Sequence, residues 1–285
     1  MKRLVLVANA ERTEAVAAMH RAADWLAGRA EVVDRVTEDN GPLADLGADA
    51  IVTFGGDGTL LNVARRLDGA PVPVLGIHVG RLGYLAALTP DEMLKGLGAL
   101  LDDEVRVTER MMLACTLPAQ ARARKCRALN DVLVATRGGR MVELEIEADD
   151  RPLISLRGDG VIVATPTGST AHSMSAGGPI LSPELRAVVL TPVCPHELAN
   201  RPLVVSDAER LRIRLAADSP GARAAVDGEY NVPLDAGDEV VVQAAQACLR
   251  LVEMPGQGRY TILRRKLGWG GSARPMGPAD AEGTT

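Results

Sequence analysis

Hydrophobic and polar positions follow two different periods along this chain. Up to about residue 101, short apolar runs at 4–7, 51–54 and 74–77 alternate with helical patterns at 11–28 and 90–101. Apolar runs of this length indicate buried strands, and helices between them predict βαβ units. We therefore expect an α/β domain built on a parallel, Rossmann-like sheet.

From about Val105 the apolar period changes to two. Runs at 141–146, 211–215 and 240–242 alternate and are separated by turn sequences. This pattern predicts a mainly antiparallel β-sandwich domain. A final amphipathic stretch at 260–267 predicts a helix.

The 285 residues exceed the size at which one core stops growing, which is roughly 250 residues. We expect an α/β domain at 1–101, a β-rich domain at 102–256 and a C-terminal helix at 257–270 that returns to pack on the first domain. Residues 271–285 carry no apolar period, so a flexible tail is predicted there.

Composition and charge narrow the function classes. With 47% apolar and 24% charged residues the chain is typical of globular proteins, and its net charge of −5 argues against nucleic-acid binding. No apolar stretch approaches the roughly 18 residues of a membrane span, so no membrane partner is expected. The four cysteines form no C-x-x-C pair, which favours a reducing cytoplasm over a zinc or disulfide framework.

The first candidate for chemistry is the glycine-rich segment Gly55–Thr59. It follows the apolar run at 51–54 and opens a helical pattern, so backbone N–H groups and the positive end of a helix dipole face the same point. Gly55, Gly56 and Gly58 permit close backbone approach and tolerate positive φ. With Thr59 they predict a phosphate-binding loop.

Asp57 makes this loop unusual, because a carboxylate repels phosphate unless a proton or a metal lies between them. It can accept a proton from an attacking hydroxyl or help to hold Mg²⁺ on a triphosphate. The alternative is a tight turn with a capping aspartate. Neither the P-loop pattern nor the G-x-G-x-x-G pattern occurs, which excludes those two modes of nucleotide binding.

A second segment, residues 159–179, joins an apolar strand to small polar residues and glycines. Their hydroxyl and N–H groups suit a purine edge, a ribose or a phosphate. A Ser/Thr/Gly loop without any ligand is the alternative.

Together these motifs resemble the bacterial NAD kinase family. The shared markers, in the family's order, are Gly-Gly-Asp-Gly-Thr at 55–59, Asn130-Asp131, residues 159–179, residues 191–196 with 200–202, Asp-Gly-Glu at 227–229 and Leu-Arg-Arg-Lys-Leu at 263–267. The first marker is shared with diacylglycerol, sphingosine and 6-phosphofructokinases. Pro-Thr-Gly-Ser-Thr-Ala at 166–171 is far more specific.

The resemblance implies that ATP, with Mg²⁺ or another divalent metal, phosphorylates the 2′-hydroxyl of the adenosine ribose of NAD to give NADP. It assigns proton acceptance to Asp57 and makes the β-rich domain the NAD-binding one. No protein residue is expected to fix the metal by itself. The implied NAD-binding residues are Asp57, Gly58, Leu61, Tyr84, Asn130, Asp131, Arg140, Arg157, Asp159, Thr170, Ala171, His172, Ser173, Met174, Ser175 and Glu229.

Some of these residues have a more specific implied role, and others have a structural alternative. Asp159 is implied near the adenine amino group, and Arg157 resembles a residue that reaches a neighbouring subunit's site, so a homodimer or homotetramer is expected. His172 replaces the family's usual Tyr. Arg140 and Glu229 have the alternative of solvated turn charges, and Tyr84 that of core packing.

Two other functions fit parts of the sequence. A lipid kinase of the diacylglycerol type shares the first motif, but no apolar entrance for acyl chains is evident. A non-catalytic NAD(P)-binding sensor would share the fold, but it has no use for a carboxylate at position 57.

Overall fold

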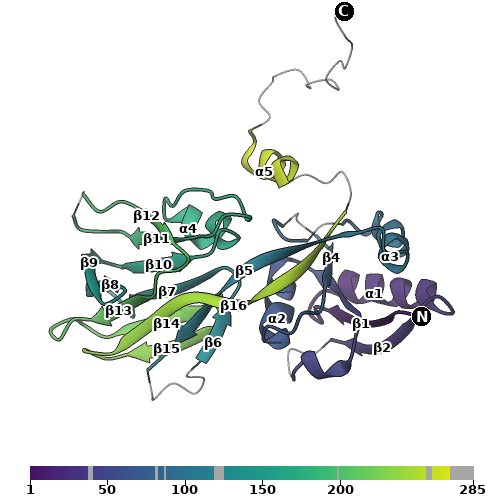
Figure 1. Ribbon diagram of the computed structural model, residues 1–285, viewed down its shortest axis with the longest axis horizontal. Helices are drawn as coiled ribbons and strands as arrows, with labels where there is room; N and C mark the ends of the chain where they lie inside the picture. The colour runs from purple at the N-terminus through teal and green to yellow at the C-terminus, as the bar shows by residue number, and fades with distance from the viewer. Residues whose placement is uncertain are drawn as a thin grey trace, which may run out of the picture.

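The computed structural model describes residues 1–37, 41–80, 83–86, 88–118, 125–197, 199–254 and 259–269. Two halves lie side by side, an α/β half and a β-rich half, with the C-terminal helix above the junction (Figure 1). The tail predicted at 271–285 lies outside the described residues.

The N-terminal half is a parallel sheet with helices on both faces. Its strands are β1 (Arg3–Ala8), β2 (Glu31–Val36), β3 (Ala50–Gly55) and β4 (Val74–His78), in the spatial order β2-β1-β3-β4. Its helices are α1 (Thr13–Leu26), α2 (Asp57–Leu67) and α3 (Met93–Leu101), with a 3₁₀ turn at Ala44–Leu46. The predicted parallel sheet is confirmed.

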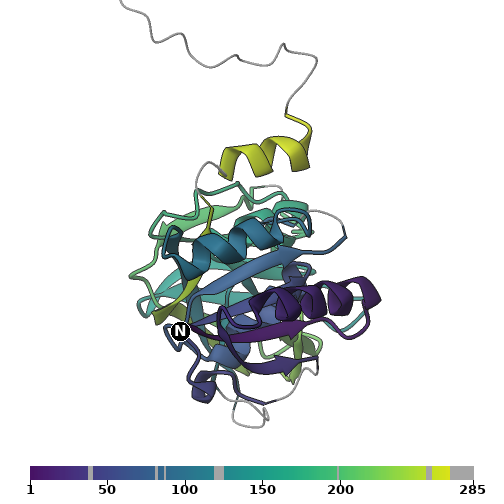
Figure 2. The ribbon, with the colours of Figure 1, turned by 90° about the vertical axis from the view of Figure 1, so that its right-hand side faces the viewer.

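Alternation along the strands sorts their side chains between the two faces. Leu4 and Leu6 of β1 pack in the core that contains α1 and α3, which lie next to each other in Figure 2. Val5 and Val7 pack on the other face with α2. Strands β1, β3 and β4 are therefore buried on both sides, which explains their continuous apolar runs, whereas β2 is a half-exposed edge strand.

The C-terminal half is the predicted antiparallel sandwich. One sheet has the order β12-β11-β10-β7-β14-β15, and the other contains β5, β6, β8, β9, β13 and β16. Side chains of both sheets share one core, for example Val132 and Val163 with Ile213 and Val242. The strand bounds are β5 (Arg106–Thr116), β6 (Lys125–Ala128), β7 (Asp131–Thr136), β8 (Val142–Ala148), β9 (Arg151–Gly158), β10 (Gly160–Ala164), β11 (Ala187–Val193), β12 (Leu203–Ser206), β13 (Leu211–Leu215), β14 (Ala222–Val226), β15 (Tyr230–Leu234) and β16 (Glu239–Glu253).

The two halves share a sheet, which the sequence did not indicate. Strand β16 has 15 residues and pairs antiparallel with β5 along most of its length. Near its end it pairs in parallel with β4, through Leu251 and Val74. Ten strands therefore form one sheet across the junction, and the ends of β5 and β16 contribute Val107 and Val252 to the core of the first half.

Short helical segments follow the strands that carry the motifs. The 159–179 segment contains a 3₁₀ turn, η2 (Gly168–Thr170), and α4 (His172–Ser175). The last helix, α5 (Arg259–Leu267), returns to the first half as predicted, because its Lys266 ammonium lies 5.3 Å from the Tyr84 ring centre.

Candidate active site

The Gly55–Thr59 loop joins the end of β3 to the start of α2, as the sequence predicts. Gly56 precedes the helix, and Asp57 is its first residue. The N–H groups of Thr59 and Leu60 donate back to the Gly56 carbonyl, at 3.1 and 3.4 Å. The loop therefore places the start of a helix of 11 residues at the carboxyl edge of a parallel sheet, where α/β proteins bind ligands.

Of the three loop glycines, only Gly55 is required for space. None of them has a positive φ, so the tolerance of glycine for that conformation is not used in this loop. A Cβ on Gly55 would lie 2.1 Å from Thr59 Oγ1, whereas one on Gly56 or Gly58 would meet nothing within 4 Å. Gly55 thus accommodates Thr59, and the other two leave the rim of the loop open to a ligand.

A second loop holds the Asp57 carboxylate. The Tyr84 N–H donates to Oδ2 at 2.8 Å and the Leu85 N–H donates to Oδ1 at 3.1 Å. A Cβ on Gly83 would lie 1.9 Å from Oδ1, so only glycine permits this approach. The carboxylate is fixed at the helix start, and each oxygen keeps acceptor capacity for a further proton donor.

This carboxylate faces a hollow of about 560 Å³. The lining residues are Arg12, Gly56, Asp57, Gly58, Gly80, Gly83 and Lys266. Three of them, Gly56, Asp57 and Gly58, are predicted site residues. The hollow can therefore accept an anionic group against the loop.

His78 lies at the end of β4, paired in register with Gly55. It is 7% exposed, and its Nδ1 has no hydrogen-bond partner among the described residues. Burial lowers the pKa of His78, the nearby Asp57 charge opposes this effect, and Lys266 reinforces it. A neutral imidazole therefore lies beside the loop.

A second hollow, of about 220 Å³, lies in the β-rich half. Its lining consists of Asn130, Asp131, Leu133, Ala171, His172, Ala225, Asp227 and Gly228. The structure thus brings together the Asn-Asp pair and the start of α4, which were predicted to share a ligand. Amide, carboxyl and imidazole groups gathered there suit the hydroxyls of a sugar.

Asp227 organises this second hollow. Its carboxylate accepts the N–H groups of Leu129 at 2.7 Å, Asn130 at 2.8 Å and Asp131 at 3.0 Å. In return the Asp227 N–H donates to the Asp131 carbonyl at 3.0 Å. The backbone that presents the Asn-Asp pair is therefore fixed by one side chain.

Asp131 and Asp227 also interact through their charges. Asp131 is 6% exposed, and burial together with the charge of Asp227 raises its pKa to about 7. Burial raises the pKa of Asp227 as well, while its three N–H donors and Arg65 oppose that rise. Asp131 is therefore the member of the pair that holds a proton near neutral pH.

The 159–179 segment packs directly on the Asn130 backbone. The Thr165 hydroxyl donates to the Leu129 carbonyl at 2.6 Å, and the Thr165 N–H donates to the Asn130 carbonyl at 2.8 Å. A Cβ on Gly168 would lie 2.1 Å from that Asn130 oxygen. Ser173 is fully buried against Thr191, with 2.8 Å between the hydroxyl oxygens. Most of these small polar residues thus shape the hollow and do not line it.

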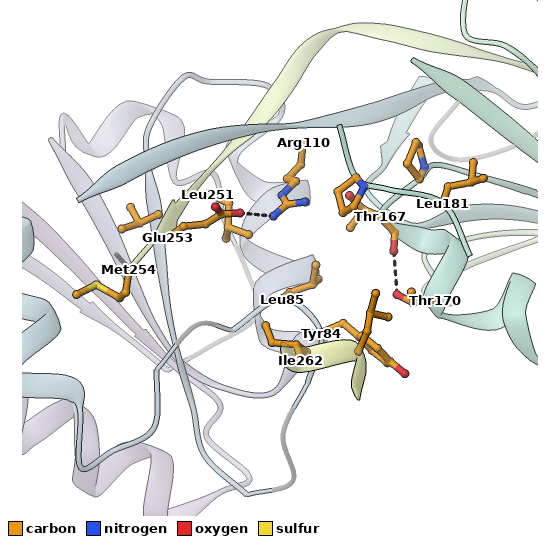
Figure 3. A pocket seen from close by; sticks show the side chains of 14 residues that line it. Tyr84, Leu85, Arg110, Thr167, Thr170, Leu181, Leu251, Glu253, Met254 and Ile262 are labelled. Atoms are coloured by element: carbon orange, nitrogen blue, oxygen red, sulfur yellow. Dashed lines mark hydrogen bonds and ion pairs between the residues drawn. The ribbon is translucent and has the colours of Figure 1, made fainter. Parts of the chain in front are cut away.

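A third hollow, of about 70 Å³, lies where the halves meet under α5. Tyr84 of the first half and Thr170 of the second both line it, together with Ile262 and Leu263 of α5 (Figure 3). On its far side Arg110 pairs with Glu253 at 2.5 Å. Tyr84 therefore lines the hollow between the two halves while its amide N–H donates to Asp57.

The remaining predicted residues are dispersed. Arg140 and Arg157 are exposed, and Asp159 lies opposite Thr136, five residues along β7 from Asp131. At about 3.3 Å per residue that separation is roughly 17 Å. None of these three residues lines the hollows described. Glu229 is exposed and 3.8 Å from Arg65, while Leu61, Met174 and Ser175 lie outside the three linings.

Sequence reasoning missed five residues that the structure brings to the site: Arg12, His78, Gly83, Asp227 and Lys266. Asp227 and Lys266 belong to the family markers at 227–229 and 263–267, but the sequence did not indicate what their side chains do. Gly83 was signalled by its place before Tyr84. Arg12 and His78 stand alone in the sequence and gave no signal.

The described residues were considered for metal-binding clusters and for helices that could cross a membrane. Within the described ranges, no cluster of three or more His, Cys, Asp or Glu residues could bind a metal ion. In the same part of the chain, every helix is too short or too polar to cross a bilayer.

The fold and the site define a class of enzyme in which a glycine-rich loop that carries an aspartate is combined with a β-sandwich. The chain belongs to the ATP-NAD kinase family. Residues 4–105 match the ATP-NAD kinase N-terminal domain and residues 129–254 match the ATP-NAD kinase C-terminal domain. The lipid-kinase and sensor alternatives are not favoured by these matches.

Particular relatives agree along nearly the whole chain. NAD kinase of Syntrophotalea carbinolica is 39% identical over 95% of this chain and 99% of its own, and that of Acidithiobacillus ferrooxidans is 41% identical over 80% and 78%. Yeast NADH kinase, solved with NADH, superposes with a TM-score of 0.80 at 25% identity, covering 98% of this chain and 90% of its own. An NAD kinase from Archaeoglobus fulgidus, solved with ATP, has a TM-score of 0.74 at 26% identity, covering 93% and 97%.

Proposed function

We propose that this protein is an NAD kinase that transfers the terminal phosphoryl group of ATP to the 2′-hydroxyl of the adenosine ribose of NAD, giving NADP. The observation that carries the proposal is the Asp57 carboxylate, fixed by two N–H bonds at a helix start. It faces a hollow that can hold an anion, and Tyr84 links it to the junction with the β-rich half. Family membership supports the same activity.

The reaction needs one proton acceptor and a group of hydrogen-bond donors for the negative charge on the transferring phosphoryl group. The 2′-oxygen forms a bond to phosphorus, the bond from phosphorus to the leaving ADP oxygen breaks, and the hydroxyl proton passes to Asp57. The open rim at Gly56 and Gly58 lets backbone N–H groups approach the transferring group. Because these donors are already oriented, they stabilise the transition state without reorganisation.

The acceptor sugar is held by the second hollow. Asn130 offers both a donor and an acceptor, and the protonated Asp131 adds one donor, so vicinal ribose hydroxyls can be matched. Asp227 keeps the backbone of both residues in place. His172 lines this hollow at the position where the family that the chain resembles usually has Tyr.

A divalent metal fits the site as an ion bound to the phosphates of ATP. Mg²⁺ commonly uses one or two carboxylates together with phosphates and water, and Asp57 is the one carboxylate in the described lining of the loop hollow. When bound, the ion would neutralise charge on the donor phosphates. Positioning and proton acceptance remain tasks of the protein's own residues.

Assembly and location complete the proposal. Asp159 lies roughly 17 Å along the sheet from Asp131, and Arg157, two residues before it on β9, is exposed outside the three hollows. We infer that they serve the site of a neighbouring subunit in a homodimer or homotetramer. The four cysteines are all unpaired in disulfides, which supports a reducing compartment such as the cytoplasm.

The activity is tested by incubating the purified protein with NAD, ATP and Mg²⁺ and detecting NADP through an NADP-specific dehydrogenase. NADP should accumulate and require both substrates. Replacing ATP by polyphosphate, and NAD by NADH, defines the donor and acceptor range. Absence of NADP with every donor and metal would contradict the proposal.

A further inference from the structure

The hollow beside Asp57 carries more positive charge than the loop alone explains. Two cationic side chains, Arg12 and Lys266, line it together with one carboxylate. Within the described part of this lining, positive charges exceed negative ones by one, in a chain whose net charge is −5. A local excess of this sign concentrates polyanions there.

Arg12 is held against the backbone at the end of β4. It lies between β1 and α1, and its Nη1 donates to the Val79 carbonyl at 2.9 Å. A Cβ on Gly80 would lie 2.8 Å from this nitrogen, and Gly80 also has a φ of +100°. The positive φ therefore favours glycine at position 80, and a Cβ there would displace the tip of the Arg12 side chain. A single carbonyl uses one of the five guanidinium donors, so the others remain suited to phosphate oxygens.

Lys266 reaches the hollow from α5, far away in sequence. Its ammonium lies 5.3 Å from the Tyr84 ring centre, within the range of a cation–π contact. The same Tyr84 donates its N–H to Asp57. One residue therefore fixes the carboxylate through its amide and the cation through its ring.

We propose that Arg12 and Lys266 form a clamp for the terminal phosphoryl groups of the donor. This proposal rests on the proposed function and adds the residues that bind its donor. Both side chains line the Asp57 hollow, and neither lines the hollow around Asn130 where the acceptor sugar is placed. Arg12 is the anchored member, and Lys266 contributes a compact charge from α5.

The clamp accounts for the charge balance of the transfer. As the bond from phosphorus to the leaving oxygen breaks, negative charge moves onto the β-phosphate of ADP, and the two cations stabilise it. The proton from the 2′-hydroxyl goes to Asp57 and not to Lys266, because an ammonium ion has no acceptor capacity. The cations therefore act on the donor and Asp57 on the acceptor.

Steady-state kinetics of Lys266→Met, Lys266→Arg and Arg12→Met test the clamp. Removing a charged phosphate contact should raise the KM for ATP about 10- to 100-fold and leave the KM for NAD within about 2-fold. Lys266→Arg should recover most of the loss. Lys95→Met, at an exposed position of α3, is the matched control and should resemble the unmodified protein.

Binding of inorganic tripolyphosphate to the full chain, measured by calorimetry without NAD, separates this proposal from the kinase activity. The unmodified protein should bind it, and the Arg12→Met/Lys266→Met variant, with an unchanged melting temperature, should not. An unchanged KM for ATP in both single variants would overturn the clamp. So would equal tripolyphosphate binding by the double variant, whether or not NADP is formed.

Discussion

Two buried carboxyl groups, Asp131 and Asp227, set the electrostatics of the acceptor hollow at the scale of single residues. They divide their roles by environment. Asp227 receives three backbone N–H groups, which stabilise its charge. Among the described residues no backbone N–H donates to the Asp131 side chain, and its burial beside that charge raises its pKa to about 7. Asp131 is thus a hydrogen-bond donor and Asp227 a charged acceptor that anchors the backbone, although the two side chains are identical.

The raised pKa of Asp131 predicts a pH-dependent stability. Between its ordinary pKa of 3.8 and about 7, the native state holds a proton that the unfolded chain releases. The free energy of unfolding should therefore fall as pH rises through this window, by at most ~1.4 kcal/mol per pH unit. Asp131→Asn replaces the ionisable carboxyl group by an amide that stays neutral, so this pH dependence is lost.

Chemical denaturation at pH 5 and pH 8 measures the effect. The stability of Asp131→Asn relative to the unmodified protein should rise between the two pH values, and exposed Asp91→Asn should show no such rise. A constant difference for Asp131→Asn would show that Asp131 carries no native proton in this range.

Gly83 is the residue that lets the second loop hold Asp57. A methyl group there would lie 1.9 Å from Oδ1 and must displace either the loop or the carboxylate. Because a displacement of about 1 Å costs roughly 10²-fold in rate, Gly83→Ala should lower kcat by about that factor. Gly98→Ala in α3, whose added methyl group would come no closer than 3.9 Å to Trp25, is the control for NADP formation. Equal rates for the two variants would exclude the positioning role.

At the scale of elements, the Asp227 side chain joins the turn after β14 to the start of β7. Asp227→Ala would leave three backbone N–H groups without their acceptor, and each buried loss costs about 1–3 kcal/mol. We expect the free energy of unfolding to fall by about 3 kcal/mol and the KM for NAD to rise. Denaturant titration and NAD kinetics check both, with Asp91→Ala as control. A stability within about 0.5 kcal/mol of the unmodified protein would contradict this role.

The elements show what sequence patterns can and cannot predict. The strand, turn and helix around Asp57 were predictable because a fully buried strand and a glycine-rich turn are local signals. Strand β2 was not, because it is a half-exposed edge strand with a mixed pattern. The long β16 and the contacts of Lys266 and Gly83 depend on pairings between distant segments, which no local period encodes.

At the scale of the whole molecule, a single sheet ties the halves together, while the predicted adenosine contacts are spread over roughly 17 Å. If sites are shared, a subunit with Asn130→Ala and one with Arg157→Ala and Asp159→Ala should complement each other. Random mixing of dimers should then restore about a quarter of the activity.

The mixing experiment uses co-refolded subunits and the NADP assay. Each inactive parent refolded alone is the control. No recovery in a mixture shown to contain hybrid oligomers would place Arg157 and Asp159 outside the neighbour's site.

The central claim is that Asp57 removes the proton from the ribose hydroxyl during phosphoryl transfer. The most direct measurement is kcat for Asp57→Asn beside its dissociation constant for NAD. General-base loss predicts a kcat lower by about 10²–10⁴-fold with NAD binding nearly unchanged. An unchanged kcat in that variant would contradict the account.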